Sequence, residues 1–231
     1  MSSQRHRIRF AMVAVILTLM VAFPMVDVAQ EEGTEAENGE NGDRAIVDLV
    51  QRLTFELIPE ESEIRFAGTV PIAPNFSGRA ERFEGTIGGH PPNLEADAFA
   101  EIVIEAVSLN TGLGLRDRDM RRALEAETYP QIRFSMKPGN LEHLGERPVE
   151  IRTDALYRSR VVGVIELHGV QQEITMEVEW ELSGDRLHIS GETSLLLSDY
   201  GIDRPRPPLL PVRVDDEIQV SFSITGKLIE D

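Results

Sequence analysis

The stretch that decides the fold is ITMEVEWEL, residues 174–182. Apolar residues stand at every second position from Ile174 to Leu182, and a Thr or Glu fills each position between them. A side-chain period of two belongs to a β-strand with one dry face and one wet face. The sequence therefore predicts a strand here, with its apolar face turned toward a core.

The same alternation recurs in other parts of the chain. It is clear in IQVSFSIT at residues 218–225, in IRFSM at 132–136 and, more briefly, at Ile64 and Phe66. Gly184–Asp185 stands between two such stretches and is typical of a tight hairpin turn. About eight or more strands with short connections predict an all-β, antiparallel domain. The alternation by itself does not distinguish a β-barrel from a β-sandwich.

One segment, residues 116–127, has the pattern of a short helix. It is rich in helix-forming residues, and Asp117 precedes Arg121 by four positions, so the opposite charges lie on one face. Pro130 ends the pattern. We therefore expect a single helix within an otherwise β-rich domain.

The first 29 residues have the pattern of an export signal. Three arginines precede an apolar run at residues 10–26, and a cleavage point is expected after Ala29. Asp27 does not suit the small-residue rule at that point, and the run is long enough to span a bilayer at the short end of the range. The alternative is therefore an uncleaved N-terminal anchor that tethers the protein to a membrane through residues 10–26.

An acidic linker is predicted between this segment and the folded domain. Residues 30–44 are rich in Glu, Gly and Asn and lack any apolar period, so they cannot bury enough surface to offset their ordering entropy. Residues 45–231 are expected to form the β-domain. The predicted location is outside the cytoplasm, or at the membrane if the signal is retained.

Charge and composition exclude several classes of function. The formal net charge is −17, which argues against DNA, RNA and anionic lipid surfaces as partners. The chain has no cysteine, which excludes disulfides, thiol catalysis, Cys-bound zinc and a lipoprotein anchor. The histidines match no metal-ligand spacing, and no nucleophile elbow or phosphate loop is found, so we predict no metal and no cofactor.

Seven stretches carry a resemblance to a known family. They are FEGTI at 83–87, SLNTG at 108–112, RD at 116–117, YPQIRFS at 129–135, GVIELHGV at 163–170, SDYGI at 198–202 and VDDEI at 214–218. In this order and spacing they make the chain similar to the YceI-like lipid- or polyisoprenoid-binding proteins over about residues 53–229. Two departures concern ligand choice rather than fold: residues 123–126 lack the family's usual aromatics, and Glu166 stands where Thr is usual.

The resemblance implies a lipocalin-like antiparallel β-barrel of about eight strands that a bacterial cell exports to the periplasm or secretes. Its apolar tunnel would hold a polyisoprenoid-type chain, such as a quinone tail or polyprenyl lipid, or a fatty acyl chain. The protein would then be a carrier or sequestering protein and not an enzyme. The loops at residues 71–78 and 205–211 are expected to act as a lid.

Alternation alone would also suit a solid core, but the resemblance favours a tunnel. The inward-facing residues predicted to contact the ligand are Phe66, Phe83, Ile102, Ile104, Phe134, Met136, Ile165, Leu167, Met176, Val178, Trp180 and Phe222. Arg116 and His168 are the candidates for contacts with a polar head group; the alternatives are a surface helix start and a hydrogen bond within a turn.

Two other functions remain open at this point. An enzyme acting on lipid-like substrates would have to use Asp117, Asp119 or His168, although the sequence offers no nucleophile–base pair. A solid β-barrel could instead serve as a stress-response or interaction module tethered by an uncleaved N-terminal helix. The sequence does not specify the oligomeric state.

Overall fold

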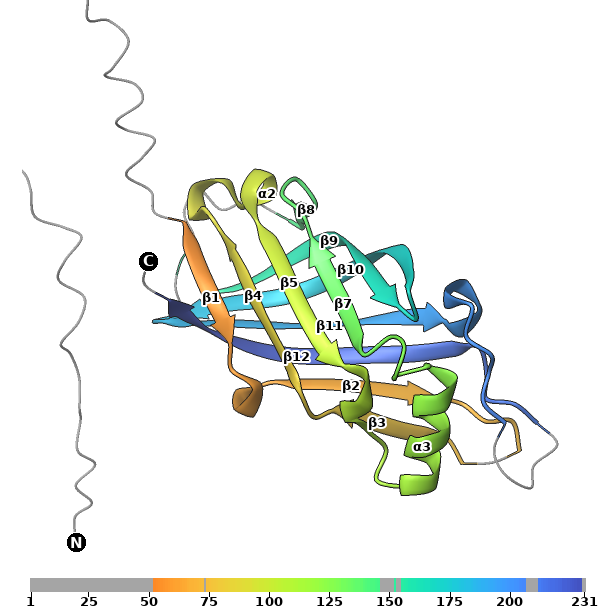
Figure 1. Cartoon of the computed structure of the whole chain (residues 1–231). Coiled ribbons are helices and arrows are strands. Elements are labelled where there is room, and N and C mark those ends of the chain that lie inside the picture. Colours follow the sequence, from red (N-terminus) through yellow and green to blue (C-terminus); the bar gives the residue numbers. More distant parts are fainter. Residues whose placement is uncertain (1–51, 73, 146–151, 153–154, 207–211, 230–231) are drawn as a thin grey trace, which may run out of the picture. The chain divides into compact units, whose positions relative to one another are not determined.

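The computed structural model describes residues 52–72, 74–145, 152, 155–206 and 212–229 (Figure 1). The predicted signal segment, its alternative role as an anchor, the acidic linker and the start of the predicted domain all lie outside the described residues. So do residues 207–211, which formed most of one predicted lid loop.

Among the described residues, twelve strands form one antiparallel sheet. They are β1 (Leu53–Leu57), β2 (Glu63–Gly68), β3 (Phe76–Ala80), β4 (Phe83–Gly89), β5 (Phe99–Glu105), β6 (Leu109–Asn110), β7 (Gln131–Met136), β8 (Leu141–His143), β9 (Leu156–Leu167), β10 (Val170–Ser183), β11 (Arg186–Leu196) and β12 (Glu217–Ile229). The helical elements are η1 (Pro59–Glu61), η2 (Pro91–Asn93), α2 (Leu94–Asp97), η3 (Ala106–Ser108), α3 (Gly114–Ala123) and η4 (Leu197–Tyr200).

Eight of the strands close into a barrel. Their order is β1, β4, β5, β7, β9, β10, β11 and β12, and β12 pairs back with β1. Closure pairs the two outer strands of this eight-stranded set, β1 and β12, with each other, so neither offers an open edge to another chain there. The predicted antiparallel, lipocalin-like barrel of about eight strands is confirmed.

The strand β12 is flanked along its length by two successive strands. Residues 226–229 pair with β1, and residues 218–223 pair with β2. The chain leaves the sheet between β1 and β2 at Pro59, whose nitrogen has no hydrogen to donate to a ladder. Because β3 and β6 extend the sheet beyond β2, the wall continues past the end of β1 toward α3 (Figure 1).

The alternation in residues 174–182 produces the expected strand. Met176, Val178 and Trp180 are buried, whereas the glutamates between them are exposed. The strand continues through the turn at Gly184, where φ is +61°, into β11. A left-handed residue in a two-residue connection is what a hairpin of this type requires, so the predicted hairpin is confirmed.

The predicted helix begins and ends earlier than expected. α3 ends at Ala123 because Glu125 takes a left-handed conformation, with φ of +45°. The amide of Ala126 donates to the Arg121 carbonyl (3.0 Å) and that of Glu125 to the Arg122 carbonyl (3.1 Å), which is a Schellman C-cap. Glycine usually occupies this position. Because the chain has a glutamate there, the sequence did not indicate where the helix ends. The short helix α2 was not predicted, because four residues carry no helical period.

One predicted loop contains a strand. Residues 71–78 were expected to be irregular, partly because of Gly78, yet β3 begins at Phe76. Gly78 pairs with Phe66 of β2, and a Cβ at this position would lie 2.3 Å from the Phe66 ring. The glycine therefore makes room for a side chain rather than breaking the strand.

In the described part of the chain, no helix has the length and apolar character needed to cross a membrane.

Candidate ligand-binding tunnel

The barrel encloses a cavity of about 800 Å³ whose wall is almost entirely apolar. This volume lies within the roughly 300–1,000 Å³ that is typical of small-molecule sites. Both hydrophobic clusters of the barrel contribute to the wall, one around Tyr200 and Ile224 and the other around Tyr157 and Trp180. The interior is thus a hollow rather than a solid core.

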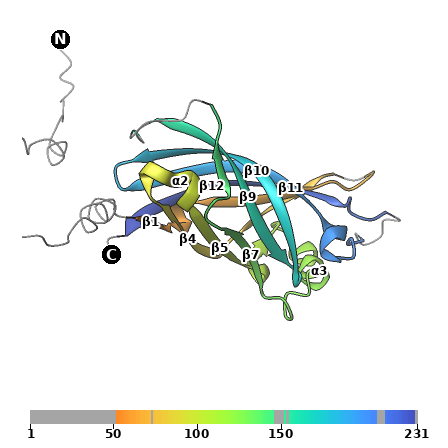
Figure 2. The same ribbon diagram turned by 90° about the horizontal axis from the view of Figure 1, so that it is seen from above.

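The cavity is elongated along the strands. On β11 alone, Leu187 and Leu195 both line it. At about 3.3 Å per residue their separation corresponds to about 26 Å. Wall residues reach from Pro91 in η2 and Leu94 in α2 to Met120 in α3. Figures 1 and 2 place α2 and α3 at opposite ends of the barrel. The shape therefore suits a long, narrow ligand.

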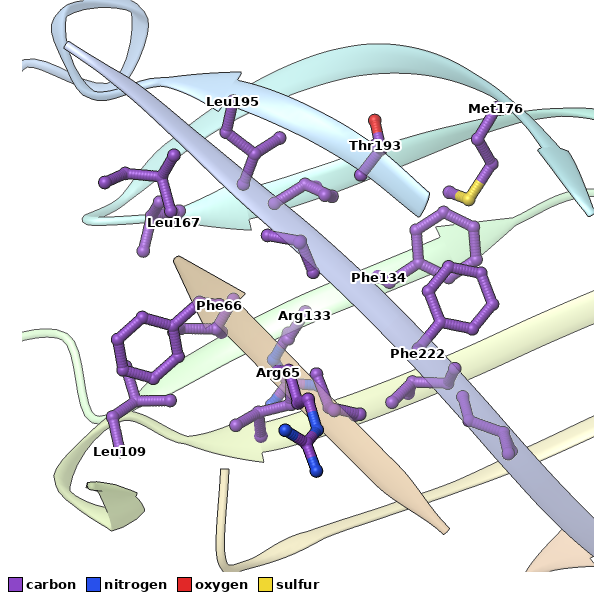
Figure 3. Close-up of a pocket in the computed structure, with 18 of the residues that line it drawn as sticks. Arg65, Phe66, Leu109, Arg133, Phe134, Leu167, Met176, Thr193, Leu195 and Phe222 are labelled. Atoms are coloured by element: carbon purple, nitrogen blue, oxygen red, sulfur yellow. The ribbon is translucent and has the colours of Figure 1, made fainter. Parts of the chain in front are cut away.

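Three phenylalanines lie on the tunnel wall with surface left exposed. Phe66, Phe134 and Phe222 are each only partly buried, although they occupy inward-facing strand positions. Figure 3 shows these rings among the other wall side chains. In a solid core such residues would be fully covered on all sides, so their exposed surface faces the hollow.

Each of these rings lies against a glycine of a neighbouring strand. A Cβ added to Gly78 would lie 2.3 Å from Phe66, one added to Gly163 would lie 2.2 Å from Phe134, and one added to Gly191 would lie 2.8 Å from Phe222. Real Cβ atoms do not approach other atoms this closely, so the rings would have to move. The glycines let the rings pack flat against the sheet, which keeps the tunnel open.

The structure places eleven of the twelve predicted contact residues on the tunnel wall. They are Phe66, Ile102, Ile104, Phe134, Met136, Ile165, Leu167, Met176, Val178, Trp180 and Phe222. They come from β2, β5, β7, β9, β10 and β12, which closure of the barrel brings around one hollow. Their contact with a ligand stays a prediction.

The exception is Phe83, whose predicted position is corrected. It is only 7% exposed and packs in a buried cluster, where Leu57 and Ala80, like Phe83 itself, are not among the residues that line the tunnel. Phe83 is the first residue of β4, directly after the bend that separates β3 from β4. Alternation assigns a side chain to the inner face, but it does not show whether that side chain reaches the hollow.

The open end of the tunnel lies at α3. Leu113 and Leu115 line the cavity yet are 54% and 65% exposed. Pro74 and Arg206 are also exposed wall residues, and both lie in loops at this end. At the α2 end the wall residues, including Leu94 and Pro91, are only partly exposed. We call the α3 end the mouth.

Arg116 lies at the mouth, as expected of a head-group contact. It belongs to the tunnel wall, and its guanidinium carbon lies 5.5 Å from the centre of the Phe76 ring. This cation–π contact holds the charge beside the opening. The neighbouring Asp117 is buried, and it accepts hydrogen bonds from the amide (2.8 Å) and hydroxyl (2.6 Å) of Thr111. Asp117 therefore anchors the start of α3.

His168 does not belong to the tunnel wall. It ends β9 with φ of +55°, and its Nδ1 lies 3.0 Å from the carbonyl oxygen of Tyr200 in η4. Its ring meets Tyr129 edge-on, and its Nε2 lies 3.4 Å from Glu125 Oε1 without hydrogen-bond geometry. His168 connects the end of β9 to η4, rather than bonding within its own turn, and its predicted contact with a head group stays a prediction.

Polar side chains are few in the wall. They are Arg65, Arg116, Asp119, Arg133, Thr193 and Arg206. Arg65 and Arg133 occupy exposed positions that alternation assigns to the outer face, so sequence reasoning could not find them. Thr193 shares the inward face of β11 with Ile189 and Leu195. The alternation of residues 189–195 in the sequence would therefore have predicted its place on the wall (Figure 3). Leu113 in the mouth has no periodic signal.

A hydrogen bond and ring stacking position Trp180 in the tunnel wall. The indole Nε1 of Trp180 donates to Ser159 Oγ (3.0 Å), and the indole stacks on Tyr157 with a centroid distance of 4.5 Å. The hydroxyl of Tyr157 in turn accepts a hydrogen bond from the Arg152 amide (2.7 Å). These buried polar groups are satisfied by one another, which fixes the aromatic wall of this end in place.

Among the described residues, no three His, Cys, Asp or Glu side chains gather in a way that could hold a metal ion. The arrangement provides an apolar, elongated hollow with a charged opening, which is the geometry of a binding site for a hydrophobic chain.

Comparisons with solved structures show the same fold at low sequence identity. A polyisoprenoid-binding domain from Saccharophagus degradans, implicated in plant cell wall breakdown, has a TM-score of 0.62 at 17% identity, covering 77% of this chain and 99% of that one. BcnA from Burkholderia cenocepacia gives 0.61 at 17%, covering 73% and 98%. A YceI protein from Campylobacter jejuni gives 0.51 at 18%, covering 69% and 88%.

A search of curated proteins found no match. The family model for the YceI-like domain, however, matches residues 55–226. That range runs from β1 to β12 and includes the whole tunnel wall except its first residue, Leu53. Because the match covers well over half of the chain, the protein belongs to the YceI-like family.

Proposed function

We propose that the protein is an exported lipid-binding protein that holds one polyisoprenoid-type chain, such as a quinone tail or polyprenyl lipid, in its tunnel. The observation that carries this proposal is the elongated cavity of about 800 Å³ with an almost entirely apolar wall. A fatty acyl chain is the closest alternative ligand. The Saccharophagus relative, described as a polyisoprenoid-binding domain, supports the choice of ligand class.

Burial of the chain provides the affinity. Each methylene-sized group removed from water contributes about 0.8 kcal/mol, so one five-carbon isoprenoid unit contributes roughly 3–4 kcal/mol. Association costs an estimated 4–15 kcal/mol, which several units offset. Because the wall offers few polar groups, the tunnel selects ligands by the length and thickness of their apolar chain rather than by their functional groups.

The polar head of the ligand stays at the mouth. Arg116 and Arg206 are charged wall residues at this end, and Asp119 lies one turn after Arg116 on α3. A charged or hydrogen-bonding head would contact these groups while the tail extends toward Trp180. The mechanism is therefore equilibrium binding without a chemical step.

The two other functions receive less support. A solid barrel does not agree with the cavity. For an enzyme, the candidate groups are dispersed: Asp117 is bound to Thr111, Asp119 pairs with Arg122 (3.0 Å), and His168 lies outside the tunnel wall.

The decisive experiment is organic-solvent extraction of the purified protein, followed by mass spectrometry of the extract. We expect a polyisoprenoid lipid at close to one molecule per protein. The proposal fails if several expression hosts yield no lipid and the protein also takes up no added polyprenyl lipid. The intact mass of the exported protein tests the predicted removal of residues 1–29 in the same preparation.

A further inference from the structure

The tunnel wall contains a single hydroxyl among the residues that the structure describes. It belongs to Thr193, on the inward face of β11 (Figure 3). The other polar residues of the wall are charged, apart from Trp180, whose indole N–H is bonded to Ser159 (3.0 Å). No described residue exchanges a hydrogen bond with the Thr193 hydroxyl. Its oxygen is not one of the buried atoms without a partner, so it keeps an accessible surface.

The strands β10 and β11 part at the level of Thr193. Their ladder ends with the pair formed by Val178 and Gly191. Beyond this pair, in the described part of the chain, residues 170–177 keep β9 as their only partner strand, and residues 192–196 keep only β12. The facing edges of the two segments therefore lack the ladder bonds that would hold them together.

The parted edges are held at both ends. The pair of Val178 and Gly191 closes one end. Toward the mouth, the Gln172 side chain donates from Nε2 to the carbonyl oxygen of Asp199 in η4 (2.8 Å). The separation of the strands is thus a fixed feature of the barrel wall, and Thr193 lies within it.

Thr193 lies near the mouth, with most of the tunnel beyond it. Along β11 it is two residues from Leu195 and six from Leu187, which corresponds to about 7 Å and about 20 Å. With carbon–carbon bonds of about 1.5 Å, one extended isoprenoid unit spans roughly 5 Å, so about four units fit between Thr193 and Leu187. A ligand whose head reaches Thr193 still has a long apolar path for its tail.

A purely hydrocarbon ligand would cover this hydroxyl without bonding to it. Burial would separate the hydroxyl from water, and a buried hydroxyl without a partner costs free energy. An oxygen of the ligand at the same level would bond to the hydroxyl and remove that cost. Thr193 therefore favours chains that carry an oxygen over chains that do not.

The charges around the parted edges favour an uncharged oxygen. Exposed glutamates border both edges: Glu173 and Glu177 on β10, and Glu192 on β11. Arg160 of β9 lies 3.6 Å from Glu177, but the same guanidinium also binds Glu142 (2.8 Å). These surroundings are acidic on balance, so they disfavour a carboxylate or a phosphate at this level of the tunnel.

We infer that Thr193, beside the parted edges of β10 and β11, forms a hydrogen-bonding subsite for an uncharged oxygen of the ligand, such as a quinone carbonyl or a prenol hydroxyl. Binding there rests on the proposed function, because the tail of the ligand must occupy the apolar tunnel. An uncharged head enters past the mouth, whereas a charged head stays beside Arg116. Thr193 is thus the exception in a wall that otherwise selects ligands by their chain.

The test compares ligands that share one isoprenoid chain and differ in one group. They are geranylgeraniol, the hydrocarbon in which hydrogen replaces its hydroxyl, and geranylgeranoic acid, each delivered from cyclodextrin. Trp180 is the single tryptophan of the chain and lines the tunnel, so its fluorescence reports binding. Thr193→Val should weaken binding of the alcohol by about 3- to 10-fold, the net effect of one hydrogen bond. It should strengthen binding of the hydrocarbon and leave that of the acid unchanged.

Two further variants separate the hydroxyl from the shape of the side chain. Thr193→Ser keeps the hydroxyl and should retain the preference for the alcohol. Thr175→Val makes the same chemical change at an exposed position of β10 outside the tunnel wall, and it should bind all three ligands like the unaltered protein. Valine is favoured in strands, so both valine variants should fold, which thermal unfolding verifies.

The subsite and the carrier function fail in different ways. If Thr193→Val weakens the alcohol and the hydrocarbon equally, or weakens neither, the subsite is refuted and the carrier function stands. A loss for the acid as large as that for the alcohol would contradict the choice of an uncharged oxygen. If the unaltered protein binds none of the three ligands, the carrier function is refuted and the subsite with it.

Discussion

At the scale of single residues, the glycines beneath the tunnel phenylalanines determine how wide the hollow is. Gly163 of β9 is the tightest case, since a Cβ would lie 2.2 Å from Phe134. A glycine in a strand loses packing and conformational entropy, so its presence at such a position needs a steric reason. Here the reason is the aromatic ring that covers it.

We expect Gly163→Ala to displace the Phe134 ring into the tunnel. The overpacking should cost about 1–3 kcal/mol of stability and reduce ligand affinity, because the ring then occupies space needed by the chain. Urea unfolding and lipid titration measure the two effects. The double variant Gly163→Ala with Phe134→Leu restores space and should recover affinity. Unchanged binding by Gly163→Ala alone would show that the ring does not limit the tunnel.

Tyr200 gives a prediction about alkaline stability. It is 2% exposed, its hydroxyl has no hydrogen-bond partner among the described residues, and burial, with a smaller effect of Asp199, raises the pKa of its phenol to about 12. Folding thus favours the neutral phenol. Stability is fully present below about pH 10 and falls as the pH rises toward 12, by roughly 2–3 kcal/mol in total.

Tyr200→Phe should remove most of that alkaline loss. It should also stabilise the protein by about 1 kcal/mol at pH 8, because an unpaired buried hydroxyl is removed. Urea unfolding at pH 8 and pH 11 measures both effects. Tyr157→Phe is the contrasting variant: its hydroxyl accepts from the Arg152 amide, so its loss should destabilise the protein. A destabilised Tyr200→Phe variant would mean that the hydroxyl has a partner.

At the scale of elements, α3 ends in a left-handed residue that is not glycine. Glu125 closes the Schellman cap with φ of +45°, a conformation that costs an ordinary residue roughly 1–2 kcal/mol. Its carboxylate is about half exposed and lies 3.4 Å from His168 Nε2, a contact that contributes little in water.

Glu125→Gly should therefore raise the free energy of unfolding by about 1 kcal/mol. Glu127→Gly is the matched control. Glu127 is exposed and is not among the residues with positive φ, so glycine there should lower stability slightly. Chemical denaturation of the two variants decides the point. A loss of stability in Glu125→Gly would indicate that the His168 contact outweighs the backbone strain.

At the scale of the whole molecule, the tunnel should couple ligand length to stability. A ligand that binds only the folded protein stabilises it by about 2.7 kcal/mol at one hundred times its dissociation constant. For a domain of this size, that corresponds to a rise in Tm of roughly 5–10 °C. Calorimetry with polyprenyl alcohols of increasing length should show a rising Tm that reaches a plateau once the tunnel is full. A Tm independent of length would contradict a tunnel that holds the chain along its axis.

The period-two pattern was sufficient to predict most of the strands, because which face a side chain takes is a local property of extended backbone. Residues 218–225 lie within β12, and residues 174–182 lie within β10. The same pattern placed Phe134 and Trp180 on the inner face, and both line the cavity. It failed where the deciding contact is distant in sequence. Gly78 is typical of a loop in the sequence, whereas in the structure it lies in β3 and makes room for the ring of Phe66. Phe83 was predicted to contact the ligand, but its side chain faces inward without reaching the hollow.

The sequence by itself thus determined the β-rich class, the inner and outer faces of the strands and the family. Only the tertiary structure decided that the walls stand apart around an elongated cavity and that α3 lies at its mouth. The physical reason is that alternation is a property of neighbouring residues in one strand. The distance between opposite walls depends instead on the number of strands in the closed barrel and on the stagger between them. That distance is a property of the closed barrel and of no single stretch of the chain.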